Sequence, residues 1–267
     1  MRSIGHVFRE AKEERRIVLV GFVTAGDPSP DATFDIVTAL VDGGVDIIEL
    51  GIPFSDPIAD GPTIQASSLR ALNAGVTPPT VLEMADQISS SVSVPIVLLT
   101  YYNPIFRMGD EKFMKLASRS GISGIVVPDL PPEESSQYRE AAKEQRIDTI
   151  FLATPSTTPK RLNTIVASTK GFLYVVPLFG VTGARDSFDA YSGRVVKEIS
   201  SRVRGRVPVA VGFGISKPEH VKSFAEQGAD SVIVGSAIVR TIEKNLGDRK
   251  TMLKELESLA KSLSSAQ

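Results

Sequence analysis

The sequence contains no cysteine and only two histidines. The lack of cysteine excludes a disulfide framework, a thiolate nucleophile and a cysteine-ligated metal. Because His6 and His220 both fall in segments with helical patterns, a histidine-based metal site is not expected either. The sequence therefore predicts no metal, and chemistry that depends on other side chains.

An excess of charge of one sign is also missing. The chain has 30 Lys and Arg against 31 Asp and Glu, a net charge of −1, so neither nucleic acid nor an anionic membrane is favoured as a partner. The first residues, MRSIGHVFREAKEERR, carry charges throughout and lack the apolar centre of a signal peptide. No apolar run approaches the roughly 18 residues of a membrane span. We expect a cytoplasmic protein.

No lysine interrupts the apolar segments that predict strands. A Schiff-base aldolase would therefore lack its nucleophile. Lys217 is the nearest candidate, but it falls in a loop beside glycines that predict an anion site.

Apolar segments alternate with helical patterns eight times, at a spacing of roughly 25 to 35 residues, which is typical of parallel βα units. We predict one (β/α)8 TIM-barrel domain over residues 1–267, with an extra N-terminal helix that starts at Ser3 and closes the bottom of the barrel. An open doubly wound sheet is the alternative, although the segment TAGDPSP after the first strand lacks its GxGxxG turn. The predicted strands are 17–23, 45–50, 94–100, 124–127, 148–153, 172–176, 207–211 and 231–234.

Two carboxylates stand out in the segment DIIELGIPFSDPIADGPTIQ. Glu49 interrupts an apolar strand, where an unpartnered charge costs several kcal/mol or the group stays protonated. Asp60 follows in a loop rich in Pro, Gly and Asp, just before a helix that Pro62 can begin. The pair suggests acid–base chemistry, whereas the structural readings are a hydrogen-bonded buried carboxylate for Glu49 and a capping residue for Asp60.

Further polar residues fall at or near strand ends, and in a barrel the active site lies at the C-terminal ends of the strands. Asp129 ends the fourth strand and Tyr174 lies in the sixth, so both are expected near Glu49 and Asp60. Asp129 could simply hold a neighbour, and Tyr174 could be a core aromatic with a satisfied hydroxyl.

Glycine-rich segments predict an anion site. Gly212 to Ser216 follows the seventh strand and Gly235-Ser236 the eighth, the usual place for phosphate in a barrel. A third segment, VTGAR after the sixth strand, is long enough to form a lid. Plain turns and a surface loop are the alternatives.

Several of these motifs, taken in order, closely resemble the tryptophan synthase α subunit family. They are GFVTAGDP, ELGIPFSDPIADGPTIQ, VVPDLPPEES, GVTGA, VGFGIS and GSAIV, and they cover nearly the whole chain. The resemblance implies a barrel that cleaves indole-3-glycerol phosphate to indole and glyceraldehyde 3-phosphate. It also implies that Glu49 and Asp60 are catalytic, with Tyr174 assisting. It assigns phosphate contacts to Gly183, Gly214, Gly235 and Ser236, and an indole pocket to Phe22, Leu99, Tyr101 and Leu152.

The resemblance further implies a β subunit that carries its own pyridoxal phosphate, an αββα tetramer, and no cofactor in this chain. One departure is the segment Pro177-Leu178-Phe179, where the family often has Ser-Arg ahead of GVTG. That change predicts a stiffer entry to the lid. A largely non-catalytic activator of a β subunit and a free-standing indole-releasing lyase remain alternatives, and another phosphosugar barrel enzyme, such as an isomerase, would not need the apolar pocket.

Overall fold

A single ring of parallel strands forms the centre of the molecule in this computed structural model, which describes residues 3–177, 190–212 and 214–266. The strands follow the order β5-β4-β3-β2-β1-β9-β8-β7-β6. β5 and β6 are two pieces of the fifth strand expected from the sequence, separated by Phe151. The Phe151 carbonyl still accepts a hydrogen bond from the Tyr174 amide at 3.0 Å, so the ladder to β7 continues past the break. The strands are β1 Val18–Thr24, β2 Ile47–Gly51, β3 Ile96–Leu99, β4 Ile122–Val126, β5 Asp148–Ile150, β6 Leu152–Ala153, β7 Leu173–Val175, β8 Val209–Gly212 and β9 Ser231–Val234.

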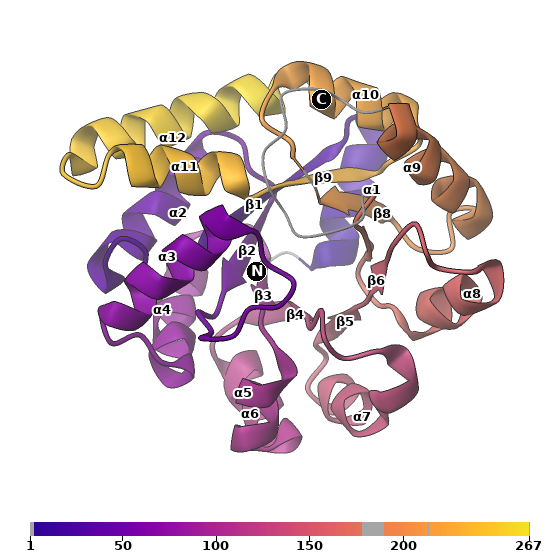
Figure 1. The fold of residues 1–267 in the computed structure, drawn as a ribbon, viewed down its shortest axis with the longest axis horizontal. Coiled ribbons are helices and arrows are strands. Elements are labelled where there is room, and N and C mark those ends of the chain that lie inside the picture. Colours follow the sequence, from indigo (N-terminus) through magenta and orange to yellow (C-terminus); the bar gives the residue numbers. More distant parts are fainter. Residues whose placement is uncertain (1–2, 178–189, 213, 267) are drawn as a thin grey trace.

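Helices surround this ring (Figure 1), so the expected TIM barrel is confirmed. They are α1 Ile4–Glu13, α2 Thr33–Asp42, α3 Pro62–Asn73, α4 Pro78–Ser91, α5 Tyr102–Met108, α6 Asp110–Arg119, α7 Ser136–Glu144, α8 Pro159–Ser168, α9 Ala190–Val203, α10 Pro218–Glu226, α11 Ser236–Lys244 and α12 Arg249–Ser264, with 3₁₀ turns η1 Pro30–Ala32 and η2 Pro132–Glu134.

α5 was not predicted from the sequence. Pro104 occupies the third position of this helix, where its missing N–H costs no internal hydrogen bond. The helix follows directly from β3, and the Asp129 carboxylate accepts a hydrogen bond from the Tyr102 amide at its start, at 2.9 Å. Asp129 therefore holds the start of a neighbouring helix, and holding a neighbour was one of the two roles considered for it.

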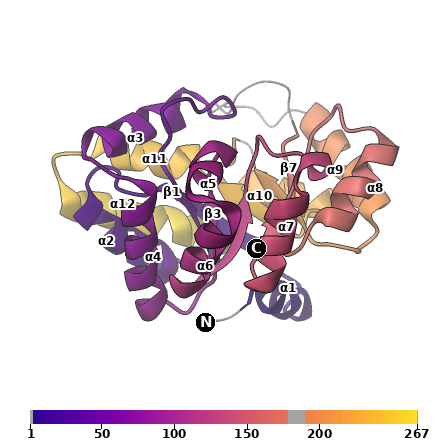
Figure 2. The ribbon, with the colours of Figure 1, turned by 90° about the horizontal axis from the view of Figure 1, so that it is seen from below.

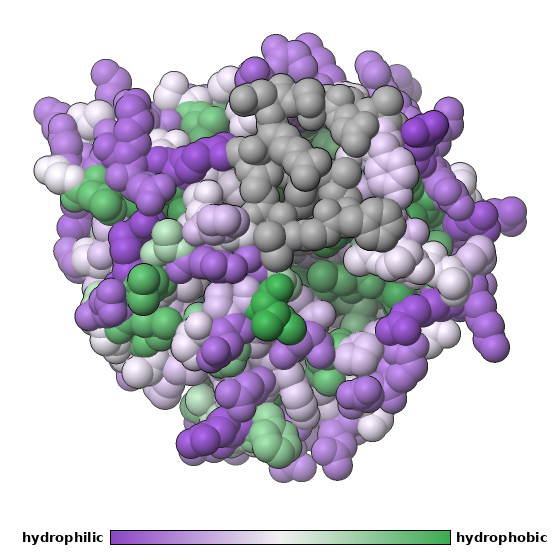
Figure 3. Space-filling view, viewed as in Figure 1, coloured by the Kyte–Doolittle hydropathy of each residue, from purple (hydrophilic) through white to green (hydrophobic). Residues whose placement is uncertain are grey.

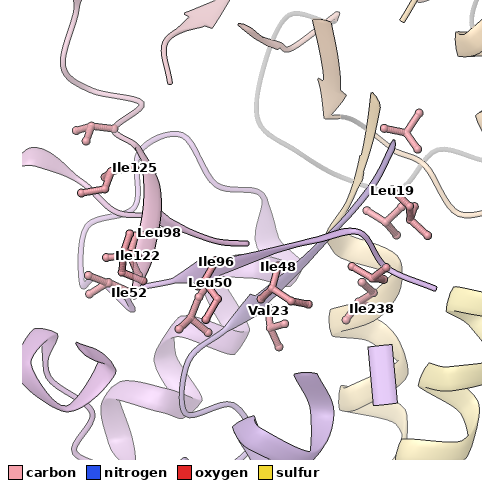
Figure 4. Packing of buried hydrophobic residues seen from close by; sticks show 14 of the residues in the cluster. Leu19, Val23, Ile48, Leu50, Ile52, Ile96, Leu98, Ile122, Ile125 and Ile238 are labelled. Atoms are coloured by element: carbon pink, nitrogen blue, oxygen red, sulfur yellow. The ribbon is translucent and has the colours of Figure 1, made fainter. Parts of the chain in front are cut away.

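Alternate residues of each strand pack outward against the helices. Ile48 and Leu50 of β2 lie in this outer layer with Leu98 of β3 (Figure 4). The side chains between them point into the barrel, because successive residues of a strand face opposite ways. The outer layer is large and apolar, so it fixes the register that sends Glu49 inward.

The bottom of the barrel interior is closed by α1, which lies at one end of the molecule (Figure 2). Its buried residues Ile4, Val7, Phe8 and Ala11 join inward-facing strand residues in one apolar cluster. Ser3 begins the helix by accepting a hydrogen bond from the His6 amide at 3.2 Å. The predicted N-terminal plug is therefore present.

No helix in the described part of the chain combines the length and the apolar character that a membrane crossing requires. The cytoplasmic location and the single-domain organisation stay predictions.

Candidate active site

A cavity opens at the C-terminal ends of the strands. Eight of the eleven residues predicted for the site line it: Phe22, Glu49, Asp60, Leu99, Tyr174, Gly214, Gly235 and Ser236. The remaining lining residues are Ile64, Gly212, Ile215, Ile233, Ala237 and Arg240. The cavity thus has an apolar wall, two acids and one arginine.

Glu49 projects from the middle of β2 into this cavity. It pairs with Phe22 of β1 and Val97 of β3 in the sheet register, and its side chain is fully buried. Neither of its carboxyl oxygens has a hydrogen-bond partner among the described residues. Burial, and next the charge of Asp60, raise the pKa of Glu49 to about 8. Glu49 therefore carries a proton at neutral pH and is poised as an acid.

Asp60 lies on the loop between β2 and α3, at the mouth of the same cavity. Its amide donates to the Pro57 carbonyl at 3.1 Å, and its carbonyl accepts from the Gln65 amide side chain at 2.8 Å. Burial raises the pKa of Asp60 to about 6, although a hydrogen bond from Tyr101 opposes that shift. At neutral pH Asp60 is ionised while Glu49 is not, and such a separation assigns different roles to two acids.

Tyr101 holds the Asp60 loop through its hydroxyl group. Its hydroxyl accepts a hydrogen bond from the Ala59 amide at 2.9 Å and donates one to Asp60, while its ring stacks on Phe54 at 5.2 Å. Tyr101 is not among the residues that line the cavity. Leu152, also assigned to the indole pocket, lines a separate depression beside Asp129.

Tyr174 lies over the end of β8. A Cβ atom at Gly212 would stand 2.4 Å from the Tyr174 hydroxyl oxygen, so only glycine permits the tyrosine to occupy this place. Burial, followed by the charges of Glu49 and Asp60, raises the pKa of Tyr174 well above its ordinary value. The hydroxyl therefore keeps its proton and can donate a hydrogen bond beside the two acids.

The other end of the cavity has glycines and a helix start, features that favour an anion. Gly214 has φ +63°, a left-handed conformation that glycine adopts without strain, and no atom of the other described residues lies within 4 Å of where its Cβ would be. Gly235 precedes α11, and in the part of the chain that the structure describes no side chain caps that helix start. The first N–H groups of a helix have no partner within the helix, and together with the helix dipole they favour an anion there.

Arg240 is the lining residue that sequence reasoning missed and that matters most. It lies four residues after Ser236 on α11, and residues at that spacing share one helix face with their side chains tilted toward the helix start. The i, i+4 spacing from the glycine-serine motif was the signal that would have found it.

Some predicted features lie elsewhere. Gly183 and most of the segment Pro177-Leu178-Phe179 fall outside the described residues. Lys217 precedes α10 and is not among the lining residues, while the His220 ring accepts a hydrogen bond from the Ser216 amide at 3.4 Å. Within 3–177, 190–212 and 214–266, no group of three or more His, Asp or Glu is arranged to hold a metal.

One cavity of this parallel barrel brings together a protonated acid, an ionised acid, an apolar wall and a helix start that favours an anion. These features define an acid–base enzyme that acts on a phosphorylated substrate with an apolar part.

Comparison with known proteins narrows this class to one family. The sequence model of the tryptophan synthase alpha chain matches residues 8–267. The alpha chain of Methanosarcina acetivorans is 46% identical over 264 residues, covering 99% of this chain and 93% of the relative, and that of Arabidopsis thaliana is 43% identical, covering 99% and 95%. Mycobacterium tuberculosis tryptophan synthase has a chain that superposes with a TM-score of 0.89 at 36% identity, covering 100% of this chain and 98% of the other. A chain of a tryptophan synthase complex from Pyrococcus furiosus superposes with a TM-score of 0.83 at 40% identity, covering 92% of this chain and 97% of the other.

This chain belongs to the tryptophan synthase alpha chain family, as its motifs predicted. The reaction of this family is the cleavage of indole-3-glycerol phosphate, a carbon–carbon lyase reaction within tryptophan biosynthesis.

Proposed function

We propose that Glu49 and Asp60 together catalyse the cleavage of indole-3-glycerol phosphate in this chain. The observation that carries the proposal is the fully buried Glu49 carboxyl, which has no hydrogen-bond partner among the described residues and opens on the same cavity as Asp60. A buried polar group without a partner costs stability. A substrate that supplies the missing partner accounts for its presence.

Glu49 serves both proton steps. Its carboxylic acid gives a proton to indole C3, which makes the bond from C3 to the glycerol chain labile. The resulting carboxylate removes the proton from the hydroxyl on the adjoining carbon. The C–C bond then breaks, its electron pair returns to the indole ring, and an aldehyde forms. Glu49 ends protonated as it began, so the cycle needs no cofactor to take up electrons.

Asp60 stabilises the charge that arises between these steps. Protonation at C3 places positive charge on the indole nitrogen, and an ionised carboxylate that accepts the indole N–H hydrogen bond favours that state. The Tyr101 hydroxyl fixes Asp60 for this task, while Tyr174 assists by presenting its hydroxyl next to Glu49.

The two parts of the substrate match the two ends of the cavity. Phe22, Leu99 and Ile64 form an apolar wall that suits the indole ring. Gly214, Gly235 and Ser236 offer backbone N–H groups to the phosphate, with Gly183 as a further contact carried over from the family motif. Arg240 adds a positive charge at this end, where the helix dipole alone provides roughly half a charge.

We also infer that a β subunit binds this chain as an αββα tetramer and uses its own pyridoxal phosphate to consume indole. Two large apolar side chains support a partner at the cavity end of the barrel. Ile58, on the loop that carries Asp60, is 75% exposed, and Phe106 of α5 is 67% exposed. Figure 3 shows apolar side chains among hydrophilic ones on the face seen in Figure 1.

The test is indole formation from indole-3-glycerol phosphate by the purified chain, with and without a β subunit. Wild type is expected to release indole, and Glu49→Gln should lose about 10²- to 10⁴-fold in turnover while keeping its fold. Near-normal turnover of the variant would refute the role of Glu49.

The same assay separates the remaining alternatives. A chain that is silent alone and merely raises the activity of β would be a non-catalytic activator. A chain that releases indole and never co-elutes with β in size exclusion would be a free-standing lyase.

A further inference from the structure

Three segments that are distant in the sequence meet at one arginine outside the cavity. Arg70 of α3 forms a bidentate ion pair with Asp27, with Nε to Oδ1 at 2.6 Å and Nη2 to Oδ2 at 2.9 Å. Its remaining nitrogen, Nη1, donates to Glu243 of α11 at 3.2 Å. Asp27 lies in the turn after β1 and is fully buried.

The two helices that Arg70 joins carry the two halves of the proposed site. α3 begins at Pro62, two residues after Asp60, and α11 begins at Ser236 in the proposed phosphate site. Arg70 is eight residues into α3 from Pro62 and Glu243 is seven residues beyond Ser236, which corresponds to about 12 Å and about 10 Å along the helix axes. The ion pair therefore ties the helices two turns away from the cavity.

The contact from Arg70 to α11 is not what holds α3 on the barrel. The buried hydroxyls of Thr24 and Ser67 already join β1 and α3 at 2.7 Å. Glu243 is 47% exposed, and an ion pair with such a partner adds little stability. Removing this contact should therefore leave the fold intact, so its effect on the relative position of the two helices can be tested separately from stability.

Arginine is the side chain that this arrangement needs. Its planar guanidinium binds the Asp27 carboxylate with two nitrogens in a fixed fork and keeps a third for Glu243. A lysine ammonium is a single point charge, so it cannot hold both partners in one geometry.

We propose that Arg70 is a positioning residue that sets the spacing between Asp60 and the phosphate-binding start of α11. Asp27 holds Arg70 in place, and Glu243 transmits that position to α11. The inference rests on the proposed function, because the spacing matters only for a substrate that reaches from the acids to the phosphate site. Small errors of placement are costly in catalysis, and a shift of about 1 Å can lower a rate by about 10²-fold.

The test uses Glu243→Gln, which removes the charge that Arg70 holds on α11. The matched control is Glu255→Gln. Glu255 of α12 pairs with Lys244 of α11 at 3.3 Å, so this ion pair joins α11 to α12 instead of to α3. We expect Glu243→Gln to lower kcat/KM for indole-3-glycerol phosphate by about 10-fold, within the range for a misplacement of under 1 Å. Glu255→Gln should stay at the wild-type value, and Glu243→Asp should recover part of the loss.

Binding of the substrate's separate halves distinguishes positioning from damage to the fold. Glycerol 3-phosphate and indole should bind Glu243→Gln as they bind wild type, because neither reaches both ends of the cavity. Weaker binding of both halves, or an equal loss in Glu255→Gln, would overturn the inference. If wild type is active and both Glu243→Gln and Arg70→Lys keep the wild-type kcat/KM, the inference is also overturned. A wild-type chain that forms no indole would instead contradict the proposed function.

Discussion

The two ends of the barrel interior are built from the same alternating strands but are filled in opposite ways. At the bottom, Phe172 and Phe8 pack with ring centroids 6.0 Å apart within a cluster that is wholly apolar. At the top, the same inward face presents Glu49, which has no hydrogen-bond partner among the described residues, and Tyr174 beside an open cavity.

This difference separates the residues that stabilise the barrel from those that act on a substrate. One end removes apolar surface from water, which favours folding. The other leaves a carboxyl group desolvated and a cavity unfilled, and both oppose folding. Proteins commonly accept such a cost at a catalytic site.

The largest expected effect comes from the bottom of the barrel. Phe172→Ala should lower the free energy of unfolding by about 3–5 kcal/mol, because it leaves a void in a packed apolar cluster. Its kcat/KM per folded molecule should stay unchanged, whereas Phe22→Ala at the cavity wall should weaken catalysis at a smaller cost in stability. Chemical denaturation measures the stability of the two variants, and indole release measures their kcat/KM. A larger loss of stability in Phe22→Ala, or a larger loss of kcat/KM in Phe172→Ala, would contradict the comparison between the two ends.

The second-largest effect concerns the free energy of unfolding that the buried Glu49 carboxyl group costs the protein. Its pKa is about 8 in the folded chain against 4.5 ordinarily, so between those values the unfolded chain has lost a proton that the folded chain keeps. Stability therefore falls as pH rises through this window. Glu49→Gln removes the penalty and should stabilise the fold by about 3 kcal/mol at pH 7, from about 1.36 kcal/mol per pH unit.

Denaturant titrations of wild type and Glu49→Gln at several pH values measure this gain. The gain should disappear near pH 4.5 and should be absent in Glu140→Gln, where the carboxylate is exposed on α7. A variant that is less stable than wild type at pH 7 would mean that Glu49 has a hidden partner.

The smallest effect is expected at the anion end of the cavity. Arg240→Gln should weaken inhibition by glycerol 3-phosphate about 10-fold, because a hydrogen bond from a charged group is lost. Indole binding should not change, since indole carries no charge. Equal inhibition of both proteins would place Arg240 outside the phosphate contacts.

Much of the fold could be predicted because the spacing of hydrophobic residues and the positions of glycines mark helices, strands and their ends within short stretches of sequence. The bounds of β9 coincide with the strand predicted over 231–234, and α3 begins at Pro62 as predicted. α5 was missed because the residues YYNP resemble a turn, and a proline in a first helical turn looks the same in sequence as one that ends a helix.

The candidate site shows the same limit. Glu49 was predictable because a charge in an apolar strand is locally inconsistent, and Asp60 because it follows in the adjacent loop. The bridge from Tyr101 to the Asp60 loop and the Arg70 ion pairs join residues about 40 or more positions apart, which no local pattern encodes.

The most direct test of the two-acid account is the pH dependence of kcat/KM for indole-3-glycerol phosphate, which reports groups of the free enzyme. The competent form has Asp60 ionised and Glu49 protonated. We therefore predict that kcat/KM rises as pH passes about 6 and falls as pH passes about 8. A profile that is flat across this range, or that rises through pH 8, would contradict the account.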